Sequence, residues 1–283
     1  MDELIAAHAF GSEGPVTSSP DGKCAYLAEG GAIALINADH DDPNSSGNFK
    51  TPLWRKQVGS IGVVPVEIAI DPGYSFVEPI NANAPNSLLY IAGGRSGFWV
   101  MDAGVVDLTP AGGWDPYKAT RIDNSGTTNT ASQNSLRWCN DLKFMTVDGA
   151  TYVVVLFARV DKSVLRVYDI EDVRLAAAQA GEFGNELAPL FNVKLQSIPN
   201  VSGDAYAFGM DVDEVDSTHS DIYVAMGEHG IFRVRFEDTT GSLALSTPAT
   251  PVELGPYFGD SSPYVTHDST LYGNVNYYKD DDE

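Results

Sequence analysis

A short sequence pattern occurs four times in this chain, and this repetition constrains the fold more than any other feature. Two copies match best, YIAGGRSGFWVMD from Tyr90 and YVAMGEHGIFRVRFED from Tyr223. YLAEGGAIALIN from Tyr26 and YVVVLFARVDKSVLRVYD from Tyr152 are weaker copies. The copies follow one another at intervals of about 60 to 70 residues, and such a period indicates a fold built from one repeated unit.

Each copy predicts two strands joined by a short turn, because apolar residues alternate with small or polar ones. Glycine occupies the fourth position after the tyrosine at Gly30, Gly94 and Gly227, and the seventh at Gly97 and Gly230. Glycines at fixed offsets favour a tight hairpin turn that requires positive φ. The copy at Tyr152 lacks both glycines and predicts a longer hairpin at 159–162.

Further candidate strands flank each copy. Apolar segments that end in an aspartate turn precede the copies, at 15–22, 64–71, 141–149 and 207–216. Candidate outer strands follow them, at 54–60, 190–197 and 250–256. Four antiparallel strands in a radially repeated unit form the blade of a β-propeller. The sequence therefore predicts an all-β propeller of four-stranded antiparallel blades at approximately 11–60, 61–123, 136–200 and 204–258, with a partial fifth blade at 261–283.

The repeated pattern also resembles a known class of repeats. The pattern consists of a tyrosine, glycines at the fourth and seventh positions after it, and an apolar strand that ends in an acid. This pattern resembles LVIVD-type propeller repeats and the broader YVTN and WD-like propellers. The resemblance implies the propeller fold. Because propellers of this kind serve many functions, it implies no catalytic residues.

The partial fifth blade leaves three hypotheses open, since few residues follow Tyr272. A second chain or a removed segment completes a larger ring. Alternatively, the N-terminal residues 3–10 complete the last blade of a small closed propeller. In the third hypothesis the blades form an open or oligomeric assembly.

The charge of the chain excludes some partners. Asp and Glu number 39 against 17 Lys and Arg, which gives a net charge of −22. Such a surface repels nucleic acid phosphates and anionic lipid headgroups, and it suits cations, basic partners or simple solubility. No apolar run is long enough to span a membrane. The start MDELIAAHAFG lacks the features of a signal peptide, so an exported protein would have lost its signal, and we expect an extracellular or periplasmic location.

Two short features predict local structure. Cys24 and Cys139 form neither a disulfide framework nor a metal-ligand spacing, and we expect two free buried thiols. Residues 170–180 predict one helix, because they are rich in Ala, Leu and Gln, begin with acids and precede Gly181.

Propeller geometry narrows the search for a site. The turn between the second and third strands lies on the same face as the crossing between blades, and this face normally binds ligands. The residues on these turns are Glu29, Arg95, Arg159, Glu228 and His229. The residues at the crossings between blades are Trp138, Asn140, Asp141, Asp204, Asp260 and Tyr264. His267 lies on the inner strand of the fifth unit.

Six of these residues are candidate catalytic or binding residues. Arginines suit carboxylate or phosphate recognition, and a histidine beside a carboxylate can perform acid–base chemistry. Ordinary solvated turns and ion pairs between blades remain the alternative for each. The candidates are Arg95, Arg159, Glu228, His229, Asp141 and His267.

A calcium site is the only candidate cofactor site. The stretch DVDEVDSTHSD at 211–221 offers Asp211, Asp213, Asp216 and Asp221, and Ca²⁺ prefers oxygen ligands. The stretch lacks the central glycine and terminal glutamate of an EF-hand, and a polar hairpin is the alternative.

Two functions are consistent with the sequence. The first is a non-catalytic binding or assembly module that presents a rigid surface to a protein or glycan, including a second chain that completes the propeller. The second is a lyase or hydrolase that acts on a carbohydrate or small acid at the mouth of the channel. Neither hypothesis includes nucleic acid or a membrane span.

Overall fold

In the described part of the chain, each strand from β1 to β16 pairs with its neighbours in the sequence within one sheet, and β17 pairs with β15. The computed structural model describes residues 14–20, 22, 24–37, 54–58, 63–73, 88–102, 119–123, 138–158, 163–179, 186–195, 207–226, 231–238, 241–245 and 252–253. These residues form four antiparallel sheets, each with its strands in sequence order. Successive hairpins of this kind confirm the predicted all-β architecture, and the partial fifth blade lies outside the described residues.

Each sheet is one blade. Blade one contains β1 (Val16–Ser18), β2 (Cys24–Glu29), β3 (Ala32–Asn37) and β4 (Trp54–Gln57). Blade two contains β5 (Glu67–Ile70), β6 (Leu88–Ala92), β7 (Phe98–Asp102) and β8 (Ala119–Asp123). Blade three contains β9 (Trp138–Val147), β10 (Ala150–Ala158), β11 (Val164–Asp169) and β12 (Phe191–Lys194), with helix α2 (Ile170–Gln179) after β11. Blade four contains β13 (Gly209–Asp216), β14 (His219–Ala225), β15 (Ile231–Asp238), β16 (Leu243–Leu245) and β17 (Val252–Glu253).

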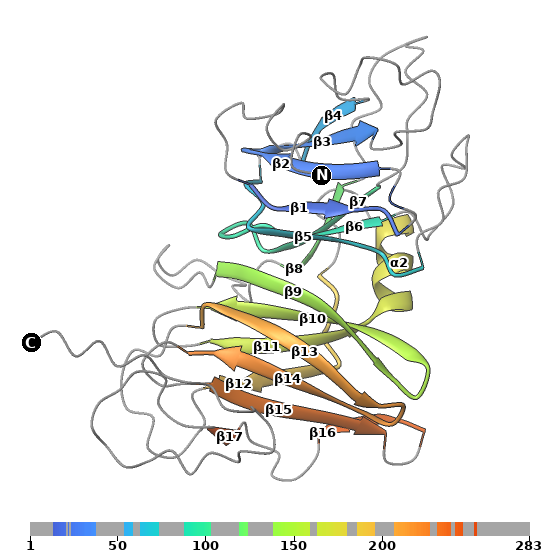
Figure 1. Ribbon diagram of the computed structural model, residues 1–283, viewed down its shortest axis with the longest axis vertical. Helices are drawn as coiled ribbons and strands as arrows, with labels where there is room; N and C mark the ends of the chain where they lie inside the picture. Colours follow the sequence, from blue (N-terminus) through green and yellow to red (C-terminus); the bar gives the residue numbers. More distant parts are fainter. Residues whose placement is uncertain are drawn as a thin grey trace, which may run out of the picture.

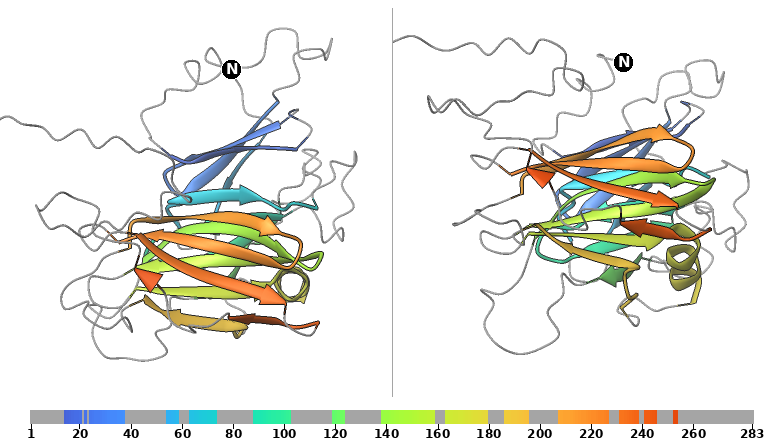
Figure 2. Two further views of the ribbon diagram at one scale, coloured as in Figure 1. Left: turned by 60° about the horizontal axis from the view of Figure 1, so that its bottom comes forward. Right: turned by 90° about the horizontal axis from the view of Figure 1, so that it is seen from below.

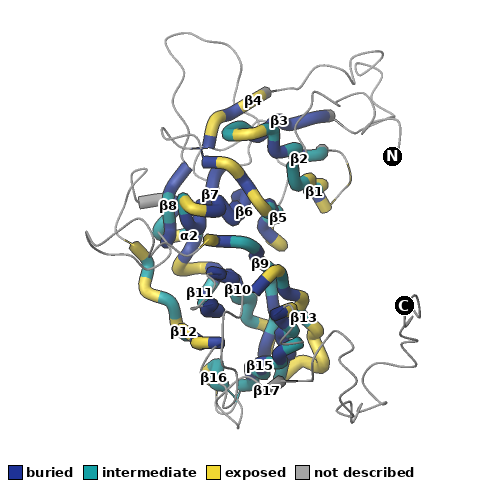
Figure 3. The backbone as a smooth tube through the Cα atoms, turned by 90° about the vertical axis from the view of Figure 1, so that its left-hand side faces the viewer, coloured by how far each residue is buried: buried dark blue, intermediate teal, exposed yellow. Residues whose placement is uncertain are grey.

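The blades lie face to face in sequence order, and α2 lies beside blades two and three (Figures 1 and 2). The first strands contact one another in turn, β1 with β5, β5 with β9 and β9 with β13. Figure 3 shows these first strands on one side and the fourth strands β4, β8, β12 and β16 on the other. First strands inside and fourth strands outside are the arrangement of a β-propeller.

Two strand assignments differ from those predicted. Strand β9 begins at Trp138 rather than at 141, because Trp138 and Cys139 still pair with the end of β10. The fourth strand of blade four, predicted at 250–256, is divided into two short segments. Strand β16 pairs with the end of β15 and β17 with its beginning.

The middle strands of blade two are buried on both faces. In β6, Leu89 and Ile91 join the apolar cluster shared with blade one, whereas Tyr90 joins the cluster shared with blade three. In β7, Trp99 belongs to the cluster shared with blade one and Val100 to the cluster shared with blade three. Because side chains alternate along a strand, one apolar run supplies both interfaces. Each fully buried large side chain contributes about 1.5–3 kcal/mol.

The repeated glycines serve the hairpin turns as predicted. Gly30, Gly94 and Gly97 adopt φ values of 59°, 53° and 93°, a region that side chains with a Cβ rarely enter. The turn in blade two closes when the Gly93 N–H donates to the Gly97 carbonyl at 2.8 Å. Gly227 and Gly230 lie outside the described residues.

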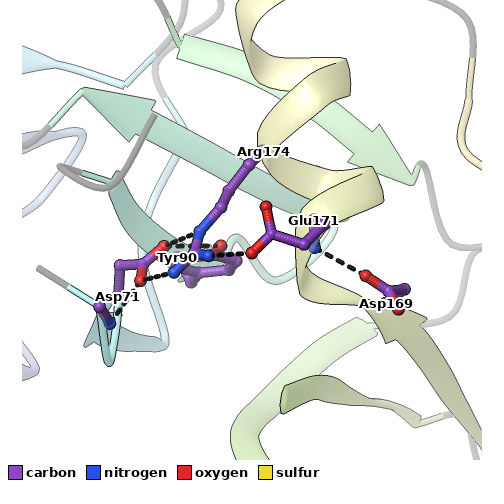
Figure 4. Close-up of polar contacts among 6 residues, drawn as sticks. Asp71, Tyr90, Asp169, Glu171 and Arg174 are labelled. Carbon is purple, nitrogen blue, oxygen red and sulfur yellow. Dashed lines mark hydrogen bonds and ion pairs between the residues drawn. The ribbon is translucent and has the colours of Figure 1, made fainter. Parts of the chain in front are cut away.

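A buried ion pair attaches α2 to blade two (Figure 4). The carboxylate of Asp71 is fully buried and accepts a bidentate pair of hydrogen bonds from Arg174, which lies on α2. Tyr90 donates its hydroxyl to the same carboxylate at 3.1 Å, and the Gly73 N–H donates at 2.7 Å. Burial, followed by the Asp71 charge, raises the pKa of Tyr90 above its usual value. Since α2 belongs to blade three, this network joins the two blades.

We expect Arg174→Met to lower the free energy of unfolding by about 3–5 kcal/mol, because it leaves the Asp71 carboxylate buried without its cation. Urea denaturation measures the loss. Leu175→Ala is the matched control on the same helix, since Leu175 is exposed, and its effect should stay within about 0.5 kcal/mol. An Arg174→Met variant as stable as this control would contradict the structural role of the ion pair.

Candidate functional site

Exposed apolar side chains gather where the first strands of the blades begin. Phe208, directly before β13, is 65% exposed, and Val64, before β5, is 59% exposed. Large apolar residues with at least a third of their surface in solvent are few in the described part of the chain. Those at the beginnings of first strands are Val16, Val64, Val66, Trp138 and Phe208, and those elsewhere are Leu175, Leu190 and Val215.

Backbone hydrogen bonds hold several of these residues together around one turn. The Gly94 N–H donates to the Cys139 carbonyl at 3.1 Å, and the Cys139 N–H donates back to Gly94 at 2.9 Å. A Cβ built on Gly94 would lie 3.4 Å from Val66 and 3.8 Å from Trp138. The β6–β7 turn, the approach to β5 and the beginning of β9 therefore meet at one point.

Arg95 completes this surface. Its guanidinium carbon lies 4.8 Å from the centroid of the Trp138 ring. A cation over an indole at an exposed site contributes about 0.5–1 kcal/mol. Asn140 donates its side-chain amide to the Ala207 carbonyl at 3.2 Å, which places Phe208 beside the beginning of β9. We call Val64, Val66, Arg95, Trp138 and Phe208 the mouth patch. The structure thus brings together Arg95 and Trp138, which the sequence placed on the binding face.

Asp141, a predicted acid–base residue, ties two blades together. It is 8% exposed, and its two oxygens accept the N–H groups of Leu142 and Met210, each at 2.8 Å. Met210 lies on the first strand of blade four, so the carboxylate links blades three and four. Hydrogen bonds from two backbone groups suit a structural carboxylate better than a base that must approach a substrate.

A lysine lies between two carboxylates on the first strands. The Nζ atom of Lys143 is 3.3 Å from Asp141 and 3.9 Å from Glu67. Burial raises the pKa of Glu67, Lys143 opposes this shift and Asp141 adds to it. Ion pairs with partly exposed groups typically contribute 0–1 kcal/mol. This group carries mixed charge beside the apolar mouth patch.

Glu29, the last residue of β2, forms an ion pair with Arg55 of β4. The other predicted site residues lie outside the described residues. The enzyme hypothesis depends on Arg159, Glu228, His229 and His267, so it stays a prediction. The blade-crossing residues Asp204, Asp260 and Tyr264 also lie outside the described residues.

The four acids of the predicted calcium loop have separate surroundings on the β13–β14 hairpin. Asp216 accepts hydrogen bonds from Thr218 and His219 in the turn, and these lower its pKa, the Thr218 hydroxyl most. Asp221 is buried and binds Arg235 in a bidentate pair at 2.6 and 2.7 Å. Asp211 and Asp213 lie on β13 and are exposed. The structure therefore shows a polar hairpin here.

No group of three or more acids, histidines or cysteines within the described ranges is arranged to hold a metal ion. Within the same residues, no helix is both long enough and apolar enough to cross a membrane. Cys139 is a free, fully buried thiol as predicted; burial, and then the charge of Asp123, raise its pKa.

A second polar site lies at the outer rim between blades two and three, and the sequence analysis missed it. Arg166 on β11 and Tyr168 both donate to Asp123, the last residue of β8. Arg166 also stacks over Phe157, with 5.0 Å between its guanidinium carbon and the ring centroid. An arginine within the largely apolar segment VLRVY (164–168) was the available signal, because a charge in a buried strand requires a partner.

Comparisons with known proteins show the fold alone. No protein-family model and no curated protein matches the sequence. Among solved structures, an ancestral GH74 enzyme has a TM-score of 0.50 and 8% identity, over 90% of this chain and 29% of that one. A chain of the yeast heterotrimeric Nup82–Nup159–Nup116 nucleoporin complex has a TM-score of 0.49 and 10% identity, over 84% of this chain and 65% of that one. The Myceliophteria thermophila Cps50 (Swd1) β-propeller domain has a TM-score of 0.45 and 9% identity, over 81% of this chain and 57% of that one. This chain spans less than two thirds of each of these chains.

We expect Asp141→Ala to lower the free energy of unfolding by about 1–3 kcal/mol, because the buried Met210 N–H loses its acceptor. The Asp141→Asn variant keeps an acceptor oxygen, so its free energy of unfolding should fall by less. Chemical denaturation of both variants checks the order. Asp172→Ala, on the exposed side of α2, serves as the control. Full stability of Asp141→Ala would show that the carboxylate is free for another role.

We expect the stability to fall as the pH rises above about 10, the usual pKa of tyrosine. Tyr90 and Tyr168 both have raised pKa values, caused first by burial and then by the charges of Asp71 and Asp123. The folded chain therefore keeps protons that the unfolded chain releases, so the stabilisation is complete below pH 10 and is lost above it. The buried Cys139 thiol adds a further loss of stability as the pH rises above about 8.5, the usual pKa of cysteine.

Urea denaturation between pH 8 and about 11.5 tests this sign, with the absorbance of ionised tyrosine as a second probe. Each buried tyrosine adds a slope of up to about 1.4 kcal/mol per pH unit above pH 10. The Tyr90→Phe/Tyr168→Phe double variant should show a shallower slope. An unchanged slope would contradict the assignment.

Proposed function

We propose that this propeller is a non-catalytic binding module that presents the mouth patch to a protein partner. The supporting observation is that Val64, Val66, Trp138 and Phe208 are exposed and all lie where the first strands begin, on the face that propellers use for binding. Isolated exposed apolar residues are ordinary, but a contiguous exposed group marks an interaction surface. Trp and Arg, the pair at the centre of this patch, are the residues that most often dominate binding energy in interfaces.

The polar groups near the patch support binding rather than catalysis. Asp141 binds two backbone N–H groups, and Lys143 lies between two carboxylates. An enzyme needs a carboxylate or imidazole that can change protonation state while it contacts the substrate. A lyase or hydrolase site remains the alternative hypothesis, and it requires Arg159, Glu228, His229 or His267 to converge on the mouth.

Charge suggests the chemistry of the partner. With a net charge of −22, the chain attracts basic proteins over long range and repels acidic ones. The mouth patch itself is apolar and aromatic. We therefore propose a partner segment with basic residues around one or two apolar side chains that cover Trp138 and Phe208.

Two finer assignments accompany this proposal. The hairpins from Tyr26, Tyr90 and Tyr223 support grouping these blades with LVIVD-type repeats, on the strength of the tyrosine and glycine positions. An extracellular or periplasmic location, where the chain acts as one subunit of a larger complex, is consistent with the acidic surface.

The test is site-specific photo-crosslinking from the full chain in an extract of its native source. A photoreactive residue at Val64 or Phe208 should attach a partner that mass spectrometry identifies. The same probe at Val215, which is exposed but lies at the far end of β13 beside the β13–β14 turn, should not. Equal labelling from all three positions would contradict the proposed surface.

The affinity of the purified partner then decides the role of individual residues. We expect Trp138→Ala and Phe208→Ala each to weaken binding by about 30-fold or more, the loss of roughly 2 kcal/mol typical of dominant interface residues. Val215→Ala should bind normally. Unchanged affinity in both mouth variants would overturn the proposal.

A further inference from the structure

The outer rim of the mouth face contains a hollow that is separate from the mouth patch. It has a volume of about 310 Å³, which lies at the lower end of the range for small-molecule sites. Asp123 pairs with Phe98 at the beginning of β7, so the hollow lies at the same end of blade two as the Gly94–Gly97 turn. Its lining residues are Asp123, Arg166, Glu186, Leu187, Ala188, Pro189 and Asn192.

The floor of the hollow is built from buried, mutually bonded groups. Asp123 is 2% exposed, and Arg166 pairs with it. The Nε atom of Arg166 also donates to Asn192 on β12, at 3.4 Å. A guanidinium has five N–H donors, and these two hydrogen bonds leave Arg166 with further donors beside the hollow.

One wall is apolar and fixed in place. Leu187 donates its N–H to the Ile122 carbonyl at 3.0 Å, which ties residues 186–189 to the outer strand of blade two. Leu187, Ala188 and Pro189 are the apolar residues that line the hollow, and Leu187 also packs against the apolar cluster between blades two and three. Small-ligand sites commonly combine apolar walls with a few fixed polar groups.

The lining of the hollow contains charges of both signs, with Asp123 paired to Arg166 and Glu186 as a second acid. Burial raises the pKa of Glu186, and Asp123 adds to the shift, whereas Arg121 and Arg166 oppose it. An anionic ligand would meet Asp123 and Glu186, and a cationic ligand would compete with Arg166 for these acids. A neutral ligand that both donates and accepts hydrogen bonds avoids both conflicts.

We propose that this hollow binds one neutral saccharide unit. Its hydroxyl groups would donate to Glu186 and to the amide oxygen of Asn192, and accept from Arg166. The C–H face of the sugar ring would pack against Leu187 and Pro189. The proposal is independent of the protein partner proposed for the mouth patch, because none of these residues belongs to that patch.

Saturation-transfer NMR of the full chain tests this with four probes: xylose and the methyl glycosides of glucose, galactose and mannose. We expect at least one probe to bind with a Kd in the millimolar range, roughly 4 kcal/mol of binding free energy. Glu186→Ala and Asn192→Ala should each weaken this binding by about tenfold. Both residues are exposed, so folding should be retained, and the melting temperature checks this. Lys194→Ala is the matched control on β12, since Lys194 does not line the hollow.

Three results would overturn the proposal. The first is no binding of any of the four saccharides at about 20 mM, well above a millimolar Kd. The second is binding that survives unchanged in both the Glu186→Ala and Asn192→Ala variants. The third is binding of acetate or methylammonium alone, which would assign the hollow to a charged ligand. Crosslinking at the mouth patch proceeds independently, so failure of one proposal does not affect the other.

Discussion

The structure depends on the burial of each inner blade between two neighbours. A sheet with both faces covered has no solvent-facing side, so its middle strands are mostly apolar. Strand β6, LLYIA, is buried throughout, and its residues alternate between the clusters shared with blades one and three. Any polar group in such a strand must find its partner within the protein, because water cannot reach it.

This constraint explains the buried acids. Asp71 binds Arg174 of α2, Asp123 binds Arg166 of β11, and both pairs cross the interface between blades two and three. Replacing a buried pair with apolar residues is often neutral, whereas removing one partner is costly. Each pair therefore constrains how blades two and three face one another, since separating its two partners would leave a buried charge unpaired. Their carboxylates are committed to structure, which directs attention to the exposed side chains as the functional ones.

The sequence predicts the blades well because their signals are local. Tyrosine and glycine positions within one hairpin predicted the turn at Gly94 and Gly97, where the structure has positive φ. The helix at 170–180 also formed as α2 from local composition and capping. Neighbouring residues in the chain carry the signals for these features, so they can be predicted without knowledge of distant contacts.

The site is less predictable because it depends on contacts between blades. Val64 and Ile68 look alike in the sequence, yet Val64 is 59% exposed and Ile68 only 2%. Asp141 resembled a catalytic acid until its partner, the Met210 N–H, was located 69 residues away. Likewise, Arg166 and Asp123 are 43 residues apart, on different blades. Exposure and long-range pairing are properties of the assembled blades, which the repeat pattern alone does not contain.

The way the mouth patch is held has a consequence for binding. Val66 and Trp138 lie against a turn that two Gly94–Cys139 backbone hydrogen bonds fix, and Arg95 is already stacked on the indole before any partner arrives. Ordering a mobile side chain on binding costs about 0.5–1.5 kcal/mol. Because strand ends and fixed turns carry these side chains, a partner would meet a surface that is largely ordered in advance. The backbone contacts that fix the β6–β7 turn against β9 therefore also fix the positions of Val66 and Trp138 at the surface.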